Sequence, residues 1–207
     1  MKKKISNYWD KFYLKKHILK PSPFAKYVLS KYKKKLQKVY EIGCGNGRDA
    51  IFFNKKKINF IGIDKSKNII KKNKLNFSKF NTKFICGDFC NFFKKKISET
   101  FCIYSRFTWH SINYKQEKKL LNYLNKQKKL DYLFIETRTI NDELYNQGKK
   151  IGEHEFITTH YRRFIDSKIL KKKLLKNFKI IYFKEGKNLA KFKNENPCVL
   201  RLIAKKK

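Results

Sequence analysis

The sequence lacks the marks of several common classes of protein. Its five cysteines include no CxxC pair and no histidine spacing typical of zinc, so no metal site is predicted. Cys44, Cys86 and Cys102 lie in apolar segments and are expected to be reduced thiols of the core. No apolar run approaches the ~18 residues of a membrane-spanning helix, and the lysine-rich start lacks the apolar stretch of a signal peptide. We therefore expect one α/β domain in a bacterial cytoplasmic protein, without a membrane span.

Acidic residues are scarce as well, since 16 Asp and Glu stand against 53 Lys and Arg, a formal charge of +37. Such a balance ordinarily indicates a nucleic-acid or anionic-membrane partner. Only six of the basic residues are arginine, however, and the lysines are scattered through almost every segment. Selected phosphate sites favour arginine, whose planar fork matches pairs of oxyanions. The lysine excess, with abundant Asn, Ile, Phe and Tyr, is instead typical of an AT-rich genome, so no specific nucleic-acid partner is predicted.

What the chain does contain is a glycine loop between an apolar strand and a helix, in the run Val39–Asp49. Gly43, Gly45 and Gly47 stand at alternate positions, which permits a tight turn and close approach to a ligand. The helix that follows begins at about Arg48, and its free N–H groups favour an anionic group at the loop. Asp64 closes a second apolar strand about 20 residues further on, where a carboxylate can accept hydrogen bonds from a ribose diol. Together these features predict a pocket for an adenosine-containing cofactor.

The spacing of the glycines narrows the choice of cofactor. The dinucleotide pattern GxGxxG would need its third glycine at Arg48, and a P-loop sequence is absent. The run from Glu41 to Gly47, acidic-x-Gly-x-Gly-x-Gly, resembles the first motif of class I S-adenosylmethionine-dependent methyltransferases. This resemblance implies that Glu41, Gly43 and Gly45 hold the methionine end of S-adenosylmethionine and that Asp64 holds its ribose. We add the neighbouring Cys44, Lys65 and Ser105 to the expected cofactor site. A structural turn without a ligand is the competing interpretation.

The resemblance extends along residues 36 to 204. Phe84–Phe89 is expected to be a strand whose Asp88 meets the adenine amino group and whose Phe89 packs on the ring. Further strands are expected at 101–107, 130–136, 178–183 and 198–204, and helices at about 48–57, 66–75, 114–128 and 167–177. The implied fold is α/β, a Rossmann-like seven-stranded mostly parallel sheet with helices on both faces and an antiparallel C-terminal strand pair.

The expected organisation has two parts. Residues 1–35 form an N-terminal helical segment, in which an aromatic cluster includes Trp9, and Ser22 is a plausible N-cap before Pro23. This segment is either a lid over the cofactor or a helix that only docks on the core. Residues 36–207 form the methyltransferase domain, with an insertion at about 137–166 that departs from strand–helix alternation and is a candidate substrate cap.

The acceptor site is predicted from side chains near the strand ends and in the insertion. Cations and hydrogen-bond donors in this region suit an anionic group on the acceptor, although the arginines of the insertion can equally pair with Glu153 and Glu155 at the surface. The predicted substrate-binding residues are Trp9, Arg106, Arg138, His160, Arg162 and Arg163. If the acceptor must lose a proton, the candidate bases are His110, Glu136 and Tyr161.

The predicted function is methyl transfer from S-adenosylmethionine to oxygen on a small anionic or sugar-linked metabolite. Short strings and the general layout loosely resemble bacterial methyltransferases associated with capsule and surface-polysaccharide biosynthesis. One alternative is an RNA or DNA methyltransferase, but the Asn/Asp-Pro-Pro-aromatic tetrapeptide of amino-group nucleobase enzymes is replaced by Ser105–Thr108. Another is a non-catalytic RNA-binding protein with this fold. The sequence leaves the acceptor atom and the oligomeric state open.

Overall fold

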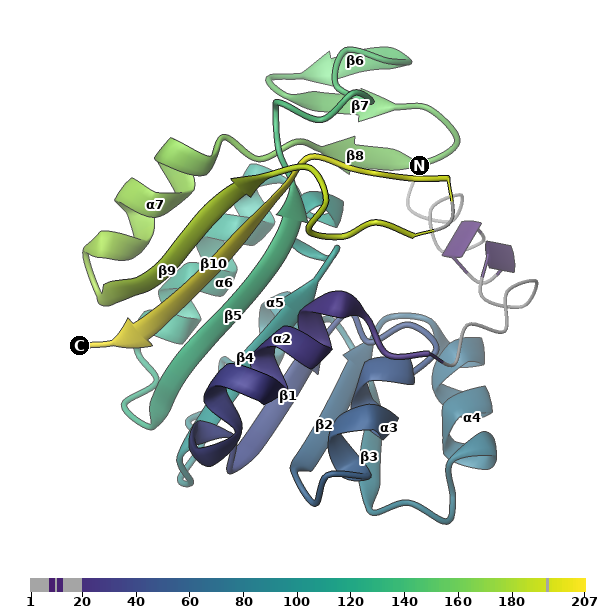
Figure 1. The fold of residues 1–207 in the computed structure, drawn as a ribbon, viewed down its shortest axis with the longest axis vertical. Helices are drawn as coiled ribbons and strands as arrows, with labels where there is room; N and C mark the ends of the chain where they lie inside the picture. Colours follow the sequence, from purple (N-terminus) through teal and green to yellow (C-terminus); the bar gives the residue numbers. More distant parts are fainter. Residues whose placement is uncertain (1–7, 10, 13–19, 193) are drawn as a thin grey trace.

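A seven-stranded sheet forms the centre of the computed structural model, which describes residues 8–9, 11–12, 20–192 and 194–207 (Figure 1). The strands, in their order across the sheet, are β3 (Thr82–Cys86), β2 (Asn59–Asp64), β1 (Lys38–Ile42), β4 (Phe101–Arg106), β5 (Leu130–Arg138), β10 (Val199–Lys206) and β9 (Phe178–Gly186). Strands β1 to β5 run parallel, whereas β10 is antiparallel to both β5 and β9. The fold predicted from the sequence is confirmed.

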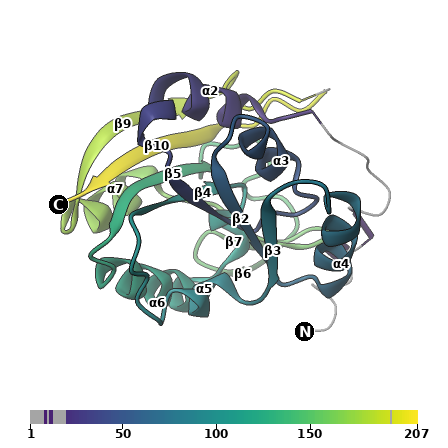
Figure 2. The ribbon, with the colours of Figure 1, turned by 90° about the horizontal axis from the view of Figure 1, so that it is seen from below.

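Helices cover both faces of this sheet, as the end-on view shows (Figure 2). One face carries α2 (Pro23–Tyr32), α3 (Arg48–Asn54) and α4 (Lys67–Asn76), and the other carries α5 (Phe89–Phe92), α6 (Tyr114–Asn125) and α7 (Ser167–Leu175). Side chains alternate between the two faces of a strand, so Val39 packs on the α2–α3 side while Tyr40 and Ile42 pack on the α5–α6 side. The sheet is therefore buried on both faces, as a parallel sheet requires.

Local capping explains where the helices begin. The hydroxyl of Ser22 accepts a hydrogen bond from the backbone N–H of Ala25, with Pro23 in the first helical position, as the sequence predicted. Asn113 and Gln116 form a reciprocal capping box at the start of α6. The predicted helices all exist, but α3 and α6 each end three residues earlier than expected. In α3 the C-terminal turn tightens before Lys57, which has a φ of 62°.

Two strand-level expectations need correction. Strand β3 ends at Cys86 and not at Phe89, because the carboxylate of Asp88 accepts the N–H of Cys90 and starts α5. Cys86, expected in the core, is exposed at this end of an edge strand. Cys44 and Cys102 are buried thiols, as predicted.

The insertion after β5 folds as a small antiparallel sheet, which the sequence did not predict. Its strands are β6 (Lys149–Gly152), β7 (Glu155–Ile157) and β8 (Tyr161–Arg163), in that order. The sheet lies beyond the carboxyl ends of β4 and β5 (Figure 1), and β8 packs against the 3₁₀ helix η2 (Trp109–Ser111) that follows β4. This arrangement gives the main sheet a second layer above its carboxyl edge.

Candidate active site

A cavity of about 750 Å³ lies at the carboxyl ends of β1, β2, β3 and β4, between the main sheet and the insertion. Most of the predicted site residues line it, from both the cofactor and the acceptor groups. These residues are Trp9, Glu41, Gly43, Cys44, Asp64, Lys65, Asp88, Phe89, Arg106, His110, Arg138, His160, Tyr161 and Arg162. Four predicted residues do not reach its wall, namely Gly45, Ser105, Glu136 and Arg163.

The glycine loop adopts a backbone that only glycine tolerates well. Gly43, Gly45 and Gly47 have φ values of 69°, 51° and 73°. A Cβ on Gly43 would stand 2.5 Å from the Thr108 hydroxyl oxygen, which donates a 2.8 Å hydrogen bond to the carbonyl of Ile42. The loop is therefore fixed against the segment that follows β4, a partnership that local sequence patterns could not reveal.

Burial of the Glu41 carboxyl group destabilises the folded protein. Its side chain is 5% exposed, and no residue that the structure describes donates a hydrogen bond to Oε2. Burial, followed by the nearby negative charge of Asp49, raises the pKa of the Glu41 carboxyl well above its usual value. A buried polar atom without a partner destabilises the folded state. A cationic or hydrogen-bond-donating group of a ligand in the cavity would relieve that cost.

The acidic residues after β2 and β3 have fixed orientations. Asp64 accepts hydrogen bonds from the backbone N–H groups of Gly45 and Ser66, each at 3.0 Å. Asp88 caps α5 and lies 3.2 Å from the ammonium of Lys65. Both carboxylates line the cavity together with Phe89, so hydrogen-bond acceptors and an apolar ring share this part of the wall.

The N-terminal segment is tied to this region at two points. The buried carboxylate of Asp49 in α3 accepts hydrogen bonds from the Ser22 N–H and hydroxyl, both at 2.7 Å, and from the Tyr104 hydroxyl at 2.9 Å. Further out, the Tyr8 ring stacks on His160 of the insertion with centroids 4.1 Å apart, and Trp9 meets the same histidine edge-on at 4.8 Å. The aromatic cluster and the insertion thus close one side of the cavity together.

His110 is the candidate base that the structure favours. It is 3% exposed, lines the cavity and has Nδ1 3.3 Å from the Thr137 hydroxyl oxygen. Burial and then the charges of Arg138 and Arg162 hold the pKa of this imidazole well below its usual value. His160 behaves alike, with a pKa of about 3 caused by burial and then by Arg162 and Arg138. Both imidazoles are therefore neutral at physiological pH, and each keeps a lone pair that can accept a proton, although burial and the two arginines make them weaker bases than a free histidine.

Glu136 and Tyr161 are placed differently from what their predicted role requires. Glu136 is fully buried, and its two oxygens accept hydrogen bonds from Arg106 at 3.1 Å and Arg201 at 2.7 Å. It therefore orients arginines and does not face the cavity. The Tyr161 hydroxyl donates to Glu155 at 2.9 Å, and burial followed by this bond raises its pKa far above the usual value. Proton acceptance by either group is disfavoured.

The adjacent arginines of β8 have opposite environments, because neighbouring side chains on a strand point to opposite faces. Arg163 is 2% exposed and binds the carboxylate of Glu117 and the carbonyl of Ile112. Arg162 lines the cavity, and its guanidinium donates a hydrogen bond to the Thr158 hydroxyl. Arg163 is thus a core residue, and the prediction that both arginines face the acceptor is not met.

Phe107, which directly follows β4, was not predicted as a site residue from the sequence. Its φ is 55°, which is unusual for a bulky residue. The guanidinium of Arg106 lies 4.2 Å from the ring centroid and that of Arg138 lies 5.7 Å away. Phe107 lines the cavity and so presents an apolar surface beside two cations.

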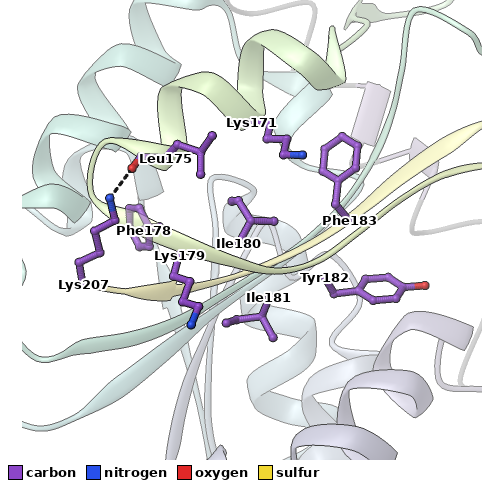
Figure 3. Close-up of a pocket in the computed structure, with 9 residues that line it drawn as sticks. All are labelled: Lys171, Leu175, Phe178, Lys179, Ile180, Ile181, Tyr182, Phe183 and Lys207. Carbon is purple, nitrogen blue, oxygen red and sulfur yellow. Dashed lines mark hydrogen bonds between the residues drawn. The ribbon is translucent and has the colours of Figure 1, made fainter.

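A second hollow, of about 640 Å³, lies between α7 and β9 (Figure 3). Its lining is apolar apart from lysines and Tyr182, and the ammonium of Lys207 is engaged with the carbonyl of Leu175 at 2.7 Å. The residues that line it include no carboxylate, histidine or cysteine. Among the described residues, the histidines and carboxylates that are candidates for the site line the first cavity and not this one. No group of three or more potential metal ligands occurs among the described residues.

Comparisons with known proteins agree with this geometry. Residues 39–127 match the family model described as a methyltransferase domain. A crystal structure of an S-adenosylmethionine-dependent methyltransferase from Anabaena variabilis superposes with a TM-score of 0.70 at 15% identity, covering 99% of this chain and 94% of that chain. Residues 39–127 therefore form a methyltransferase domain, and the chain as a whole has the fold of class I S-adenosylmethionine-dependent methyltransferases.

Other solved structures share the methyltransferase fold. An S-adenosylmethionine-dependent methyltransferase from Methanosarcina mazei has a TM-score of 0.66 at 17% identity, with 82% of this chain and 92% of that chain covered. The glycopeptide N-methyltransferase MtfA, solved with S-adenosyl-L-homocysteine, has a TM-score of 0.66 at 11% identity, with 91% and 90% covered. None of the curated protein sequences matches the chain. None of the helices that the structure describes has the length and apolar character to cross a bilayer.

Proposed function

We propose that this methyltransferase transfers a methyl group from S-adenosylmethionine to an oxygen atom of a small acceptor that carries an anionic group. The cofactor supplies an electrophilic methyl on a sulfonium. The unpaired Oε2 of Glu41 supports its placement, because the α-ammonium of the methionine moiety would give this buried atom a charged partner. Asp64 would accept hydrogen bonds from the ribose, and Asp88 with Phe89 would flank the adenine.

Arg162 supports an anionic acceptor. The other five arginines of the chain each form an ion pair with a carboxylate. Arg162 forms none with any residue that the structure describes, and burial followed by the charge of Arg138 lowers its pKa. An arginine in a cavity without a counterion is well suited to a phosphate or carboxylate of the ligand.

His110 would act as the base where the acceptor hydroxyl must lose a proton. The methyl group must be approached in line by the nucleophile, so alignment is the main task of the protein. His110, Phe107 and Arg162 line the same cavity as the glycine loop, which is the arrangement that such alignment requires. The aromatic cluster around Trp9 and the insertion at 137–166 would act as a lid and a substrate cap over the two ligands.

At a finer level, the acceptor is proposed to be a sugar, a nucleotide sugar or another phosphorylated precursor of a surface polysaccharide. Incubating the protein with labelled S-adenosylmethionine and a panel of such precursors tests this, with sugars lacking the phosphate as matched controls. We expect transfer to the phosphorylated members only. RNA in the same panel is expected to bind weakly and to lose that binding between about 50 and 200 mM salt, as counterion release dictates. Methyl transfer to RNA would refute the proposal in favour of a nucleic-acid methyltransferase.

Replacing Asp64 by alanine is expected to weaken cofactor binding by about 1.5–3 kcal/mol, the scale for hydrogen bonds to a charged group. The change removes the carboxylate that lines the cavity and also releases the N–H groups of Gly45 and Ser66. Asp64→Asn keeps an oxygen acceptor for one of these groups and is the matched variant. Calorimetric titration with S-adenosylhomocysteine measures both, and unchanged affinity in the alanine variant would remove Asp64 from the site.

A further inference from the structure

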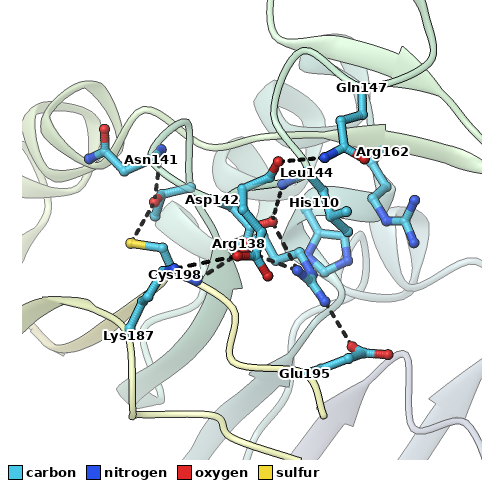
Figure 4. Close-up of polar contacts among 12 residues, drawn as sticks. His110, Arg138, Asn141, Asp142, Leu144, Gln147, Arg162, Lys187, Glu195 and Cys198 are labelled. Atoms are coloured by element: carbon cyan, nitrogen blue, oxygen red, sulfur yellow. Dashed lines mark hydrogen bonds and ion pairs between the residues drawn. The ribbon is translucent and has the colours of Figure 1, made fainter.

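Arg138 divides its guanidinium between two different carboxylates (Figure 4). Its Nη1 donates to both oxygens of Asp142, at 2.9 and 3.0 Å, and this aspartate side chain is fully buried. Its Nη2 donates to Oε2 of Glu195 at 3.1 Å, and the Glu195 side chain is 68% exposed. Nη1 of the guanidinium is thus bound to a buried carboxylate, while Nη2 contacts a carboxylate that is exposed to solvent.

Glu195 can leave Arg138 without any movement of the backbone. Its N–H and carbonyl pair with those of Phe192, at 3.0 and 2.9 Å, which fixes the main chain at these two residues. The next residue, Asn196, is braced by two hydrogen bonds to Asn188. Apart from the single bond to Arg138, the Glu195 side chain forms no hydrogen bond or ion pair with the described residues, so rotation of that side chain alone frees Nη2. An exposed pair of this kind contributes little to stability.

The formal charges of Arg138, Arg162, Asp142 and Glu195 sum to zero only while the Glu195 carboxylate lies beside Arg138. Arg138 and Asp142 neutralise each other, which leaves the positive charge of Arg162 opposite the negative charge of Glu195. The buried imidazole of His110, which faces the same cavity, is neutral because its pKa is held low by burial and the two arginines. When the Glu195 carboxylate turns into solvent, Arg138, Asp142 and Arg162 together carry one net positive charge.

We propose that Arg138 and Arg162 form the anion subsite of the acceptor, and that Glu195 occupies it in the free enzyme until the acceptor's phosphate or carboxylate displaces it. This deepens the proposed function and rests on it, since it names where the anionic group binds. Arg138, Arg162, Glu195 and His110 all line the cavity, so an acceptor held by the two guanidiniums lies beside the candidate base. Neutral analogues of the same shape would not release Arg138 from Glu195 and are rejected.

Inorganic phosphate is the probe for this subsite, titrated into protein saturated with S-adenosylhomocysteine at fixed ionic strength. Glu195→Gln removes the competing charge and should tighten phosphate binding by about two- to fivefold, the range that an exposed pair can withhold. Glu143→Gln is the matched control, because Glu143 also forms one exposed ion pair, with Lys187, but does not line the cavity. It should leave phosphate binding unchanged. Arg162→Ala should weaken phosphate binding about tenfold or more.

The outcomes distinguish failure of the anion subsite from failure of the proposed function. Equal phosphate affinity in the Glu195→Gln and Glu143→Gln variants, or no effect of Arg162→Ala, would overturn the subsite. Absence of phosphate binding in wild type and in Glu195→Gln alike would overturn it too. The loading step separates this failure from that of the proposed function, because a protein that does not bind S-adenosylhomocysteine contradicts the proposed function itself, whereas one that binds it and ignores Glu195 contradicts only the subsite.

Discussion

Replacing Arg163 by alanine is expected to lower the free energy of unfolding by about 3–5 kcal/mol, the scale for removing one partner of a buried ion pair. Glu117, which is 3% exposed, would lose the guanidinium bound to its Oε2 and keep only Trp109 Nε1 at 3.1 Å and the ammonium of Lys173 at 2.6 Å. The carbonyl of Ile112 would lose its donor as well. Chemical denaturation followed by circular dichroism measures the loss.

Arg162→Ala is the control for this prediction, because the two arginines are neighbours on β8. Arg162 has one hydrogen bond, to a hydroxyl, and no ion pair with a described residue, so its removal should change the free energy of unfolding by less than about 1 kcal/mol. It should instead raise the KM for an anionic acceptor. For a protein of this size the Arg163 variant should lose roughly 6–20 °C in Tm. Similar Tm values for the two variants would contradict the separation of the core arginine from the cavity arginine.

Replacing Glu41 by glutamine is expected to act in opposite directions on binding and stability. Cofactor affinity should fall by about 1.5–3 kcal/mol, or roughly 10- to 100-fold, because the charge facing the ligand's ammonium is lost. The free energy of unfolding should rise at neutral pH, because the variant no longer buries a carboxylate with an unpaired oxygen. Calorimetry with S-adenosylhomocysteine and thermal denaturation measure the two effects. Glu99→Gln, at an exposed pair with Lys38, should change neither.

The dependence on pH gives a second test of Glu41. Burial and Asp49 raise the pKa of its carboxyl in the folded state above the ordinary value of the unfolded chain. As the pH rises, the Glu41 carboxyl therefore loses its proton at a lower pH in the unfolded chain than in the folded protein. Its contribution to the free energy of unfolding becomes more unfavourable between the unfolded pKa and the folded pKa. Cofactor affinity should fall as the pH drops through the raised pKa in the wild type. A flat profile in the wild type, or the same slope in Glu41→Gln, would exclude Glu41 from contact with the ammonium.

The parts of the fold that could be predicted from sequence are those set by local rules. A short, mostly apolar run and the alternate glycines that follow it define β1 and its loop, and the Ser22–Pro23 pair marks the start of α2 through one side-chain hydrogen bond. The cofactor half of the cavity follows, because Glu41, Asp64 and Asp88 each sit at or beside the carboxyl end of a strand in a parallel sheet.

The remaining features depend on contacts between segments that are distant in the sequence. The short strands β6 to β8 lack a clear alternating pattern, and their role is set by packing against η2. The partners of Arg163 and Glu136 lie 46 and 65 residues away, at Glu117 and Arg201. No spacing rule in the sequence distinguishes such an arginine from Arg162, which is why the acceptor site was only partly predicted.

Replacement of arginine by lysine meets a structural limit at two positions of this lysine-rich chain. Lysine and arginine codons can differ by a single base, and 47 of the 53 basic residues of this chain are lysine. Arg163 and Arg201 each combine an ion pair with a hydrogen bond to a carbonyl, which a single ammonium cannot match in the same plane. We expect a library of single arginine-to-lysine codon changes, selected for folded protein, to be depleted at these two positions and to tolerate the change at Arg48, whose carboxylate partner lies 3.9 Å away.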